Sequence, residues 1–171
     1  MQEVQQAAAA PSPLSPPEPS RGRATDTAVP LPYRRHQSLC TDHAFVSLLE
    51  AYRGSGGLAP AEELLVSFKH RGGPDVSRLA RWIVARQVSS FAWHARTWLP
   101  LFQFCPRDMS PRRELGTVIA ELNAVYDECE LATWFATPNL SLAGRSPVQA
   151  FMTSCSAVVR AARIDRFVAD A

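Results

Sequence analysis

The chain has 171 residues, 46% of them hydrophobic, which is enough for one domain with a core of useful size. Its formal net charge is only +2, and no apolar run approaches the ~20 residues that a membrane-spanning helix needs. The first ten residues also lack the positive charge and apolar core of a signal peptide, so we expect a cytoplasmic protein without a membrane partner.

Residues 1–38 are rich in proline and alanine and hold almost no large apolar side chain. Such a segment gains too little from burial to offset the loss of chain entropy on ordering. We therefore predict a disordered leader or tether. Residues 39–90 and 91–171 are predicted to be the two folded portions.

Three helices are predicted within residues 39–90. A glycine-rich break at 54–57 ends the first helix, and another at 72–74 ends the second. Their expected starts are Thr41 or Asp42, Pro60, and Asp75 or Ser77. Helix, short glycine turn and helix is the outline of a helix-turn-helix, although bundles that do not bind DNA share it.

The third helix is predicted to have an apolar arc and an arginine-rich arc. The inward arc holds Val76, Leu79, Ala80, Ile83 and Val84, and the outward arc holds Arg78, Arg81, Trp82, Ala85 and Arg86. One interpretation is a recognition helix, with Arg78, Arg81 and Arg86 as candidate DNA-binding residues. The alternative is that Trp82 lies under the next hairpin with solvated arginines around it.

Charge is distributed unevenly along the chain. Residues 75–113 carry seven arginines against two acids, whereas residues 114–138 carry five acids and no base. This asymmetry predicts one face that attracts polyanions. The preference for arginine over lysine suits bidentate phosphate contacts, but genomic base composition explains it equally well.

Residues 88–93 and 98–104 are predicted to form a β-hairpin around the turn 94–97. Because Pro100 cannot donate a backbone hydrogen bond, the second strand should lie at an edge or be interrupted there. Both faces of this strand are mostly apolar and need cover from helices, a second protomer or a partner. Gln103 is either buried with hydrogen bonds or faces solvent at the sheet edge.

Four further helices are predicted after the hairpin, which makes the fold mainly α: a helical bundle with one β-hairpin. Their start signals are Ser110-Pro111, Asp127, Ser146-Pro147, and Ser154 or Ser156. The first of these helices is expected to carry Leu115, Val118, Ile119, Leu122 and Val125 or Tyr126 inward. The apolar residues along the other three are Leu131, Trp134 and Phe135; Val148, Phe151 and Met152; and Val158, Val159, Ala162, Phe167 and Val168.

The sequence shows no pattern of a catalytic, cofactor or metal site. It has no glycine-rich phosphate loop, no G-x-S-x-G, no H-E-x-x-H and no EF-hand spacing. His36, Cys40 and His43 suit zinc, but no fourth ligand lies nearby. The four cysteines have no C-x-x-C pair, which favours free thiols. We predict no enzyme, no cofactor and no metal.

Several segments between Leu79 and the C-terminus resemble, in order and spacing, the toxin-binding domain of Xre/MbcA/ParS antitoxins. They are Leu79–Trp82, Pro100–Phe104, Trp134-Phe135, Pro138-Asn139, Leu142, Gly144 and Pro147. These antitoxins neutralise RES-type toxins, which attack NAD or transfer ADP-ribose from it. The resemblance implies a homodimer whose C-terminal helices cover the entrance to the toxin's active site, with operator DNA as a second partner through which it represses its own operon.

On this interpretation the candidate toxin-binding anchors are Trp134, Phe135, Phe151 and Phe167, since buried aromatic side chains dominate many interfaces. The alternative for each is a contact within the core. Asn139 and Arg145 are candidates because a loop between helices exposes them, although Asn139 also suits a turn after a proline. The competing function is a stand-alone transcriptional regulator or adaptor without a toxin.

Overall fold

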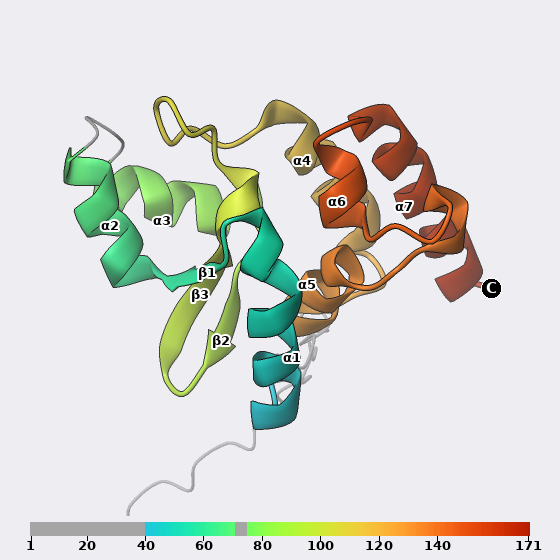
Figure 1. Cartoon of the computed structure of the whole chain (residues 1–171), viewed down its shortest axis with the longest axis horizontal. Coiled ribbons are helices and arrows are strands. Elements are labelled where there is room, and N and C mark those ends of the chain that lie inside the picture. Colours follow the sequence, from blue (N-terminus) through green and yellow to red (C-terminus); the bar gives the residue numbers. More distant parts are fainter. Residues whose placement is uncertain (1–39, 71–74) are drawn as a thin grey trace, which may run out of the picture. The chain divides into compact units, whose positions relative to one another are not determined.

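The structure, a computed structural model, describes residues 40–70 and 75–171. The predicted leader, His36 and the break at 72–74 therefore lie outside the described residues. Within these ranges the chain forms seven α-helices, three short 3-10 helices and one antiparallel sheet of three strands, which confirms the mainly α fold class (Figure 1).

The helices begin and end close to the predicted signals. They are α1 (Asp42–Tyr52), α2 (Ala61–His70), α3 (Val76–Val84), α4 (Arg113–Leu122), α5 (Glu128–Ala136), α6 (Pro147–Phe151) and α7 (Cys155–Ala169). The strands are β1 (Leu58–Pro60), β2 (Phe91–Trp93) and β3 (Arg96–Pro100), and the 3-10 helices are η1 (Arg53–Ser55), η2 (Leu101–Gln103) and η3 (Leu140–Leu142).

Side-chain caps explain where several of these helices start. The Thr41 side chain accepts a hydrogen bond from the third backbone N–H of α1, and Asp75 does the same for α3. At α5, Asp127 accepts from the Glu130 backbone N–H at 2.8 Å while the Glu130 carboxylate accepts from the Asp127 N–H at 2.9 Å. Such reciprocal bonds satisfy two N–H groups that the helix leaves unpaired.

The predicted hairpin forms, but its second strand ends at Pro100, and residues 101–103, expected to continue it, form η2 instead. A third strand joins the hairpin. β2 and β3 pair with Phe91 opposite Trp98, and His94 and Ala95 make the turn with positive φ angles of 46° and 58°. β1 pairs with the other side of β3, so β3 is the central strand and not an edge strand. Pro100 is tolerated because β3 ends there and η2 follows, as the alternative of an interrupted strand predicted.

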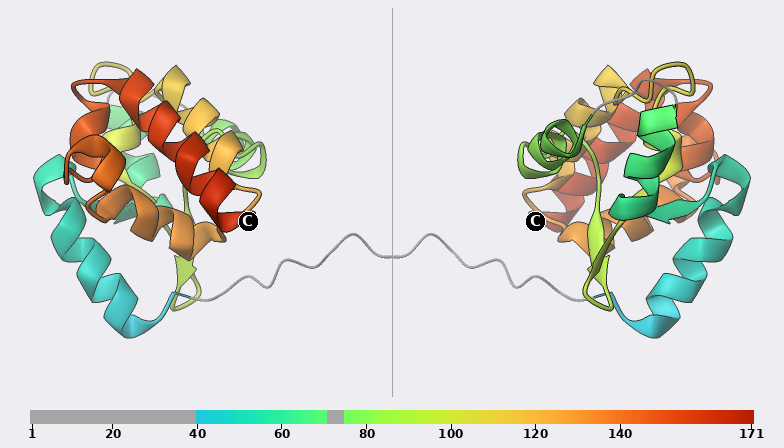
Figure 2. Two further views of the ribbon diagram at one scale, coloured as in Figure 1. Left: turned by 90° about the vertical axis from the view of Figure 1, so that its right-hand side faces the viewer. Right: turned by 90° about the vertical axis from the view of Figure 1, so that its left-hand side faces the viewer.

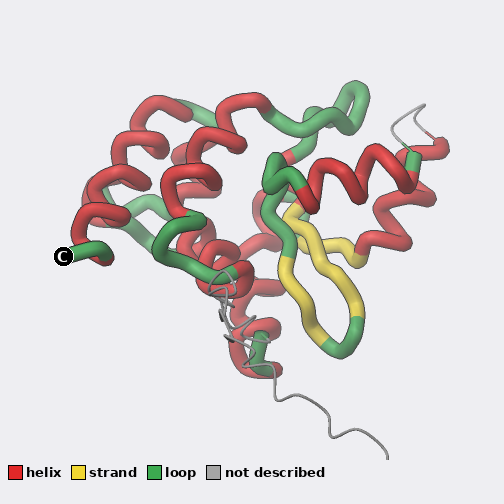
Figure 3. Tube along the Cα trace, turned by 180° about the vertical axis from the view of Figure 1, so that it is seen from behind, coloured by secondary structure: helices red, strands yellow, loops and turns green. Residues whose placement is uncertain are grey.

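The helices lie on two sides of this sheet. Figures 1 and 3 show α2 and α3 together on one side, and α4, α6 and α7 on the other. Figure 2 shows α7 running along α4, the pair of helices with the most extensive contact.

Buried apolar side chains form two separate clusters. The large cluster joins α1 and α4–α7 to the sheet, and the phenol of Tyr52, fully buried in it, donates to the Ala132 carbonyl oxygen at 2.7 Å. Burial raises the pKa of Tyr52 far above its usual value. The small cluster lies under α2 and α3 and consists of Leu64, Phe68, Leu79, Val88, Leu99, Phe104 and Met109.

Gln103 connects the two clusters. It is fully buried, and its amide makes two bonds to Ser89: the Ser89 N–H donates to Oε1 at 2.8 Å and Nε2 donates to the Ser89 carbonyl at 2.9 Å. Its neighbours Phe102 and Phe104 belong to the large and the small cluster respectively. Of the two predicted environments, the buried and hydrogen-bonded one is correct.

The predicted inward arc of α3 is wrong in part. Only Leu79 is fully buried, and Trp82 and Ile83 pack half-buried against the small cluster. Ala80 is exposed, as are Val76 and Val84, the latter to 84%. Trp82 therefore belongs to the inner side of α3. A nine-residue helix packed on one small cluster buries only a narrow face, so Val76, Ala80 and Val84 stay exposed. Other large apolar side chains on the helices are also exposed, among them Leu49, Met152, Phe167 and Val168.

The prediction of four free thiols is wrong for two of the cysteines. Cys40, which precedes α1, forms a disulfide with Cys129 in α5. Their Cα atoms lie 5.5 Å apart although 89 residues separate them in sequence, so only the packing of α1 on α5 brings them together. Cys105 and Cys155 are free and half-buried.

The described residues hold neither a cluster of metal ligands nor a helix that could span a membrane. No group of three or more His, Cys, Asp and Glu side chains in this part of the chain is placed to hold a metal ion. None of its helices combines the length and the apolar composition that crossing a lipid bilayer requires.

Candidate protein-binding surface

The C-terminal half of α7 presents three large apolar side chains to solvent. Ile164, Phe167 and Val168 are 50%, 77% and 69% exposed. Their spacing of three and four residues places them on one face of the helix. The helix α7 itself lies at the outside of the molecule in Figure 2. We call these three residues the α7 strip.

The opposite face of α7 is firmly attached to the large cluster. Val158, Ala161 and Ala162 are buried there. On α4, the Glu121 carboxylate accepts hydrogen bonds from Arg163 at 2.9 Å and from Arg166 at 3.2 Å. The Arg163 bond, followed by the Arg166 bond, lowers the pKa of Glu121. Packing and these ion pairs hold α7 in position while its outer face stays open.

The connection from α5 to α6 is tied to the same helix through Asp165. One oxygen of its carboxylate accepts from the Trp134 indole N–H at 2.6 Å and from the Asn139 amide at 2.7 Å. The Asn139 side-chain oxygen accepts from the Ser141 N–H at 2.8 Å, so Asn139 also stabilises the turn, as the alternative predicted. Leu140, which follows Asn139 and begins η3, is 96% exposed beside α7.

Three of the four candidate aromatic anchors lie in the core, as the alternative of a core contact predicted. Trp134, Phe135 and Phe151 are buried in the large cluster, where the rings of Phe135 and Phe151 lie 5.3 Å and 6.0 Å from that of Phe102. They face inward because α5 and α6 lie between other helices of the bundle. Phe167 is the predicted anchor that the structure places at the surface.

Arg145 is exposed, and its guanidinium donates to the Thr153 hydroxyl at 3.1 Å. The backbone links it to Asn139, whose N–H donates to the Arg145 carbonyl at 3.0 Å. These two predicted residues therefore belong to one closed loop, which Asn139 connects to α7.

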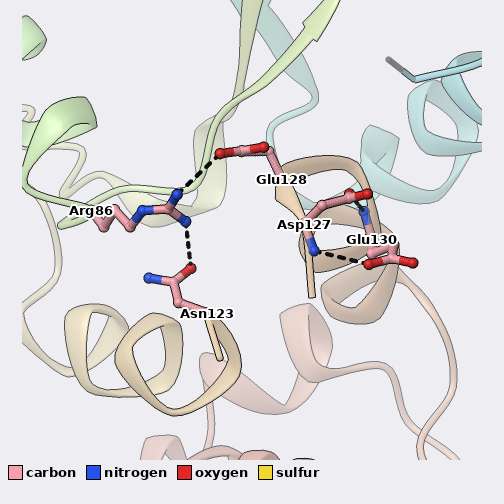
Figure 4. A network of polar contacts seen from close by, with 5 residues as sticks. All are labelled: Arg86, Asn123, Asp127, Glu128 and Glu130. Atoms are coloured by element: carbon pink, nitrogen blue, oxygen red, sulfur yellow. Dashed lines mark hydrogen bonds and ion pairs between the residues drawn. The ribbon is translucent and has the colours of Figure 1, made fainter. Parts of the chain in front are cut away.

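The three predicted DNA-binding arginines are not equivalent. Arg78 and Arg81 are exposed on α3 and have no carboxylate partner among the described residues. Arg86 follows α3, and its guanidinium pairs with Glu128 at 3.3 Å and donates to Asn123 at 3.1 Å (Figure 4). Arg86 therefore connects α3 to the junction of α4 and α5, and its guanidinium is less available to an anion than those of Arg78 and Arg81.

Sequence reasoning missed Ile164, Val168 and Leu140 as surface residues. The available signal was the composition of the buried side of α7, where two of the three buried residues are alanines. A helix that packs through alanines approaches its neighbour closely and leaves its bulkier residues outside.

Comparison with protein-family models, with curated proteins and with solved structures gives no match for the chain.

Proposed function

We propose that the chain is an antitoxin-like protein that binds a RES-type toxin in the cytoplasm and inhibits it by occlusion. The observation that carries this proposal is the α7 strip, an apolar surface on a helix whose other face is fixed. The sequence resemblance to Xre/MbcA/ParS antitoxins supplies the class of the partner.

The strip has the properties of a protein-binding surface. Exposed apolar side chains that adjoin one another are unfavourable in water and mark interaction sites in many proteins. Because Glu121 and the large cluster already hold α7 in place, binding orders little additional chain. Inhibition by this route needs only that the protein covers its target, so no catalytic side chain is required.

The strip is too small to form the whole interface. A stable interface buries about 1,600 Å² in total, which is 20–30 residues a side. Leu140 is a further exposed apolar side chain next to α7, on the side of Asp165, to which Asn139 is bonded. We therefore expect Phe167 to be the central anchor and the loop 139–145 to contribute the periphery.

Co-expression tests the proposal. Where a reading frame next to this gene encodes a RES-type protein, expression of that protein alone should arrest growth. Co-expression of the full chain should restore growth, and the chain should co-purify with the RES-type protein. Phe167→Asp and Ile164→Asp should abolish both effects. Val46→Asp is the matched control, because Val46 is 63% exposed on α1. No rescue together with no co-purification would remove the toxin-binding function.

The strip also has a competing occupant, a second copy of the chain. Sedimentation of the purified protein decides between the two, because Phe167→Asp would turn a strip-mediated homodimer into a monomer. A monomeric wild type that binds the toxin assigns the strip to the toxin alone. If the gene has no RES-type neighbour, a stand-alone regulator or adaptor becomes the better description.

A further inference from the structure

A second surface, built from α3 and the start of α4, has no part in the proposed toxin binding. One hollow of about 670 Å³ is lined by residues of α3 and its C-terminal end, among them Arg78 and Arg81. A second, of about 300 Å³, is lined by Arg112 and Arg113 at the start of α4. Trp82 and Gln87 line both hollows, so the two adjoin. We call these six residues the arginine groove.

The guanidinium groups of the four arginines in this groove are not paired with carboxylates of the described residues. The Nε atoms of Arg81 and Arg112 donate to the backbone carbonyls of Ser77 and Phe102. These bonds position the two stems and leave the terminal guanidinium nitrogens available to an anion.

An aromatic ring lies between the two pairs of arginines. Trp82 is half-buried, and its ring rests on Phe104 of the small cluster at a centroid distance of 6.4 Å and an angle of 39°. Its inner side is therefore held by the core, whereas the remainder lines the groove. Gln87 contributes an uncharged polar side chain to the groove. Its backbone N–H donates to the Trp82 carbonyl oxygen at 2.9 Å.

We propose that the arginine groove binds single-stranded nucleic acid. A basic groove that follows the phosphates, combined with an aromatic ring on which a base stacks, is the arrangement that single-strand binding requires. Duplex recognition instead needs a protruding helix with polar side chains that read base edges in the major groove. Here α3 carries no Asn or Gln, and its arginines border hollows. The expected binding is tolerant of sequence.

Fluorescence anisotropy of the full chain tests this proposal. The probes are a labelled 20-nucleotide DNA strand of mixed sequence, the same sequence as RNA, and the corresponding DNA duplex, including one from the upstream promoter. We expect the single strands to bind more tightly than either duplex. Affinity should fall with salt, with a logarithmic slope that decreases by roughly 0.7 for each arginine–phosphate contact removed.

Variants connect the binding to the groove. Arg81→Ala combined with Arg113→Ala should weaken single-strand binding by at least about tenfold and reduce the salt slope. Trp82→Leu should weaken it by roughly five- to a hundredfold through lost stacking and leave the salt slope unchanged. The control is Arg53→Ala, since Arg53 is an exposed arginine that pairs with Glu50 at the end of α1. Circular dichroism confirms that each variant is folded.

Three results would overturn the proposal. The first is no single-strand binding at low salt. The second is equal loss on changing Arg53 and the groove arginines, which would indicate net charge alone. The third is tighter binding of duplex DNA, which would support an operator-binding α3 instead. Because α7 takes no part in this groove, toxin binding and nucleic-acid binding can fail independently.

Discussion

The large and small clusters differ in how much of each helix they bury. α4 places Leu115, Val118, Ile119 and Leu122 in the large cluster, whereas α3 places only Leu79 in the small one. The better-buried part of the molecule carries the α7 strip, and the less-buried part carries the α3 side of the arginine groove. A helix with few buried contacts opens more readily, so α2 and α3 should be the less stable unit and the groove the more adaptable surface.

Core truncation in each cluster gives the largest expected effect. Phe135→Ala in the large cluster should lower the free energy of unfolding by about 3–5 kcal/mol, and Leu79→Ala in the small cluster by about 2–3 kcal/mol. Hydrogen exchange should show global loss of protection for Phe135→Ala but loss confined to α2 and α3 for Leu79→Ala. Equal, global losses for both variants would show that the two clusters unfold as one.

Removal of the disulfide tests the large cluster alone, because Cys40 belongs to this cluster and Cys129 packs against it. Cys40→Ser combined with Cys129→Ser should lower unfolding free energy by about 2–4 kcal/mol in urea, because the cross-link no longer restricts the unfolded chain. A reducing agent should bring the wild type to the same level. Cys105→Ser with Cys155→Ser is the control, and reduction should affect it as it affects the wild type.

Substitution of Gln103 tests how the clusters are connected. Gln103→Leu should cost about 2 kcal/mol, because it leaves the buried N–H and carbonyl of Ser89 without partners. We expect exchange protection to fall most near Ser89 and in the small cluster, with α4–α7 less affected. Gln103→Glu is the companion variant, since it keeps the shape of the Gln103 side chain. Unchanged stability of Gln103→Leu would mean that the amide bonds do not couple the clusters.

The smallest effect concerns the attachment of α7 to α4. The pKa of Glu121 is lowered in the folded state from its usual value of 4.5, so its ion pairs stabilise the fold above that pH and lose this contribution as the pH falls through the folded pKa. Glu121→Gln should cost less than about 1 kcal/mol at neutral pH. The difference from the wild type should vanish in acid and shrink in high salt. A difference that persists in acid would indicate packing instead.

Local signals predicted the helices well because they act over a few residues. The caps at Asp75 and Asp127 and the apolar spacing of α4 all hold in the structure. β1 was missed, since three residues are too few to show a strand period, and its pairing with β3 bridges about forty residues. The disulfide was missed because two cysteines that are 89 residues apart in sequence carry no local signal of pairing.

The candidate site was predicted less well than the fold. An aromatic residue on a helix looks the same in sequence whether it faces a core or a partner, and here Trp134, Phe135 and Phe151 face the core while Phe167 faces outward. The direction depends on which side of α7 meets α4. Likewise, the number of arginines was evident from sequence, but the pairing of Arg86 with Glu128 depends on how α5 packs.

The alternation of Phe102, Gln103 and Phe104 has a consequence for variation in length. One ring points to each cluster and the amide between them holds Ser89. Insertion or deletion of a single residue in this short turn would shift these side chains by one position, which would take the rings out of register with their clusters and move the amide away from Ser89. Although it has no regular strand, this segment should tolerate changes of side chain far better than changes of residue number.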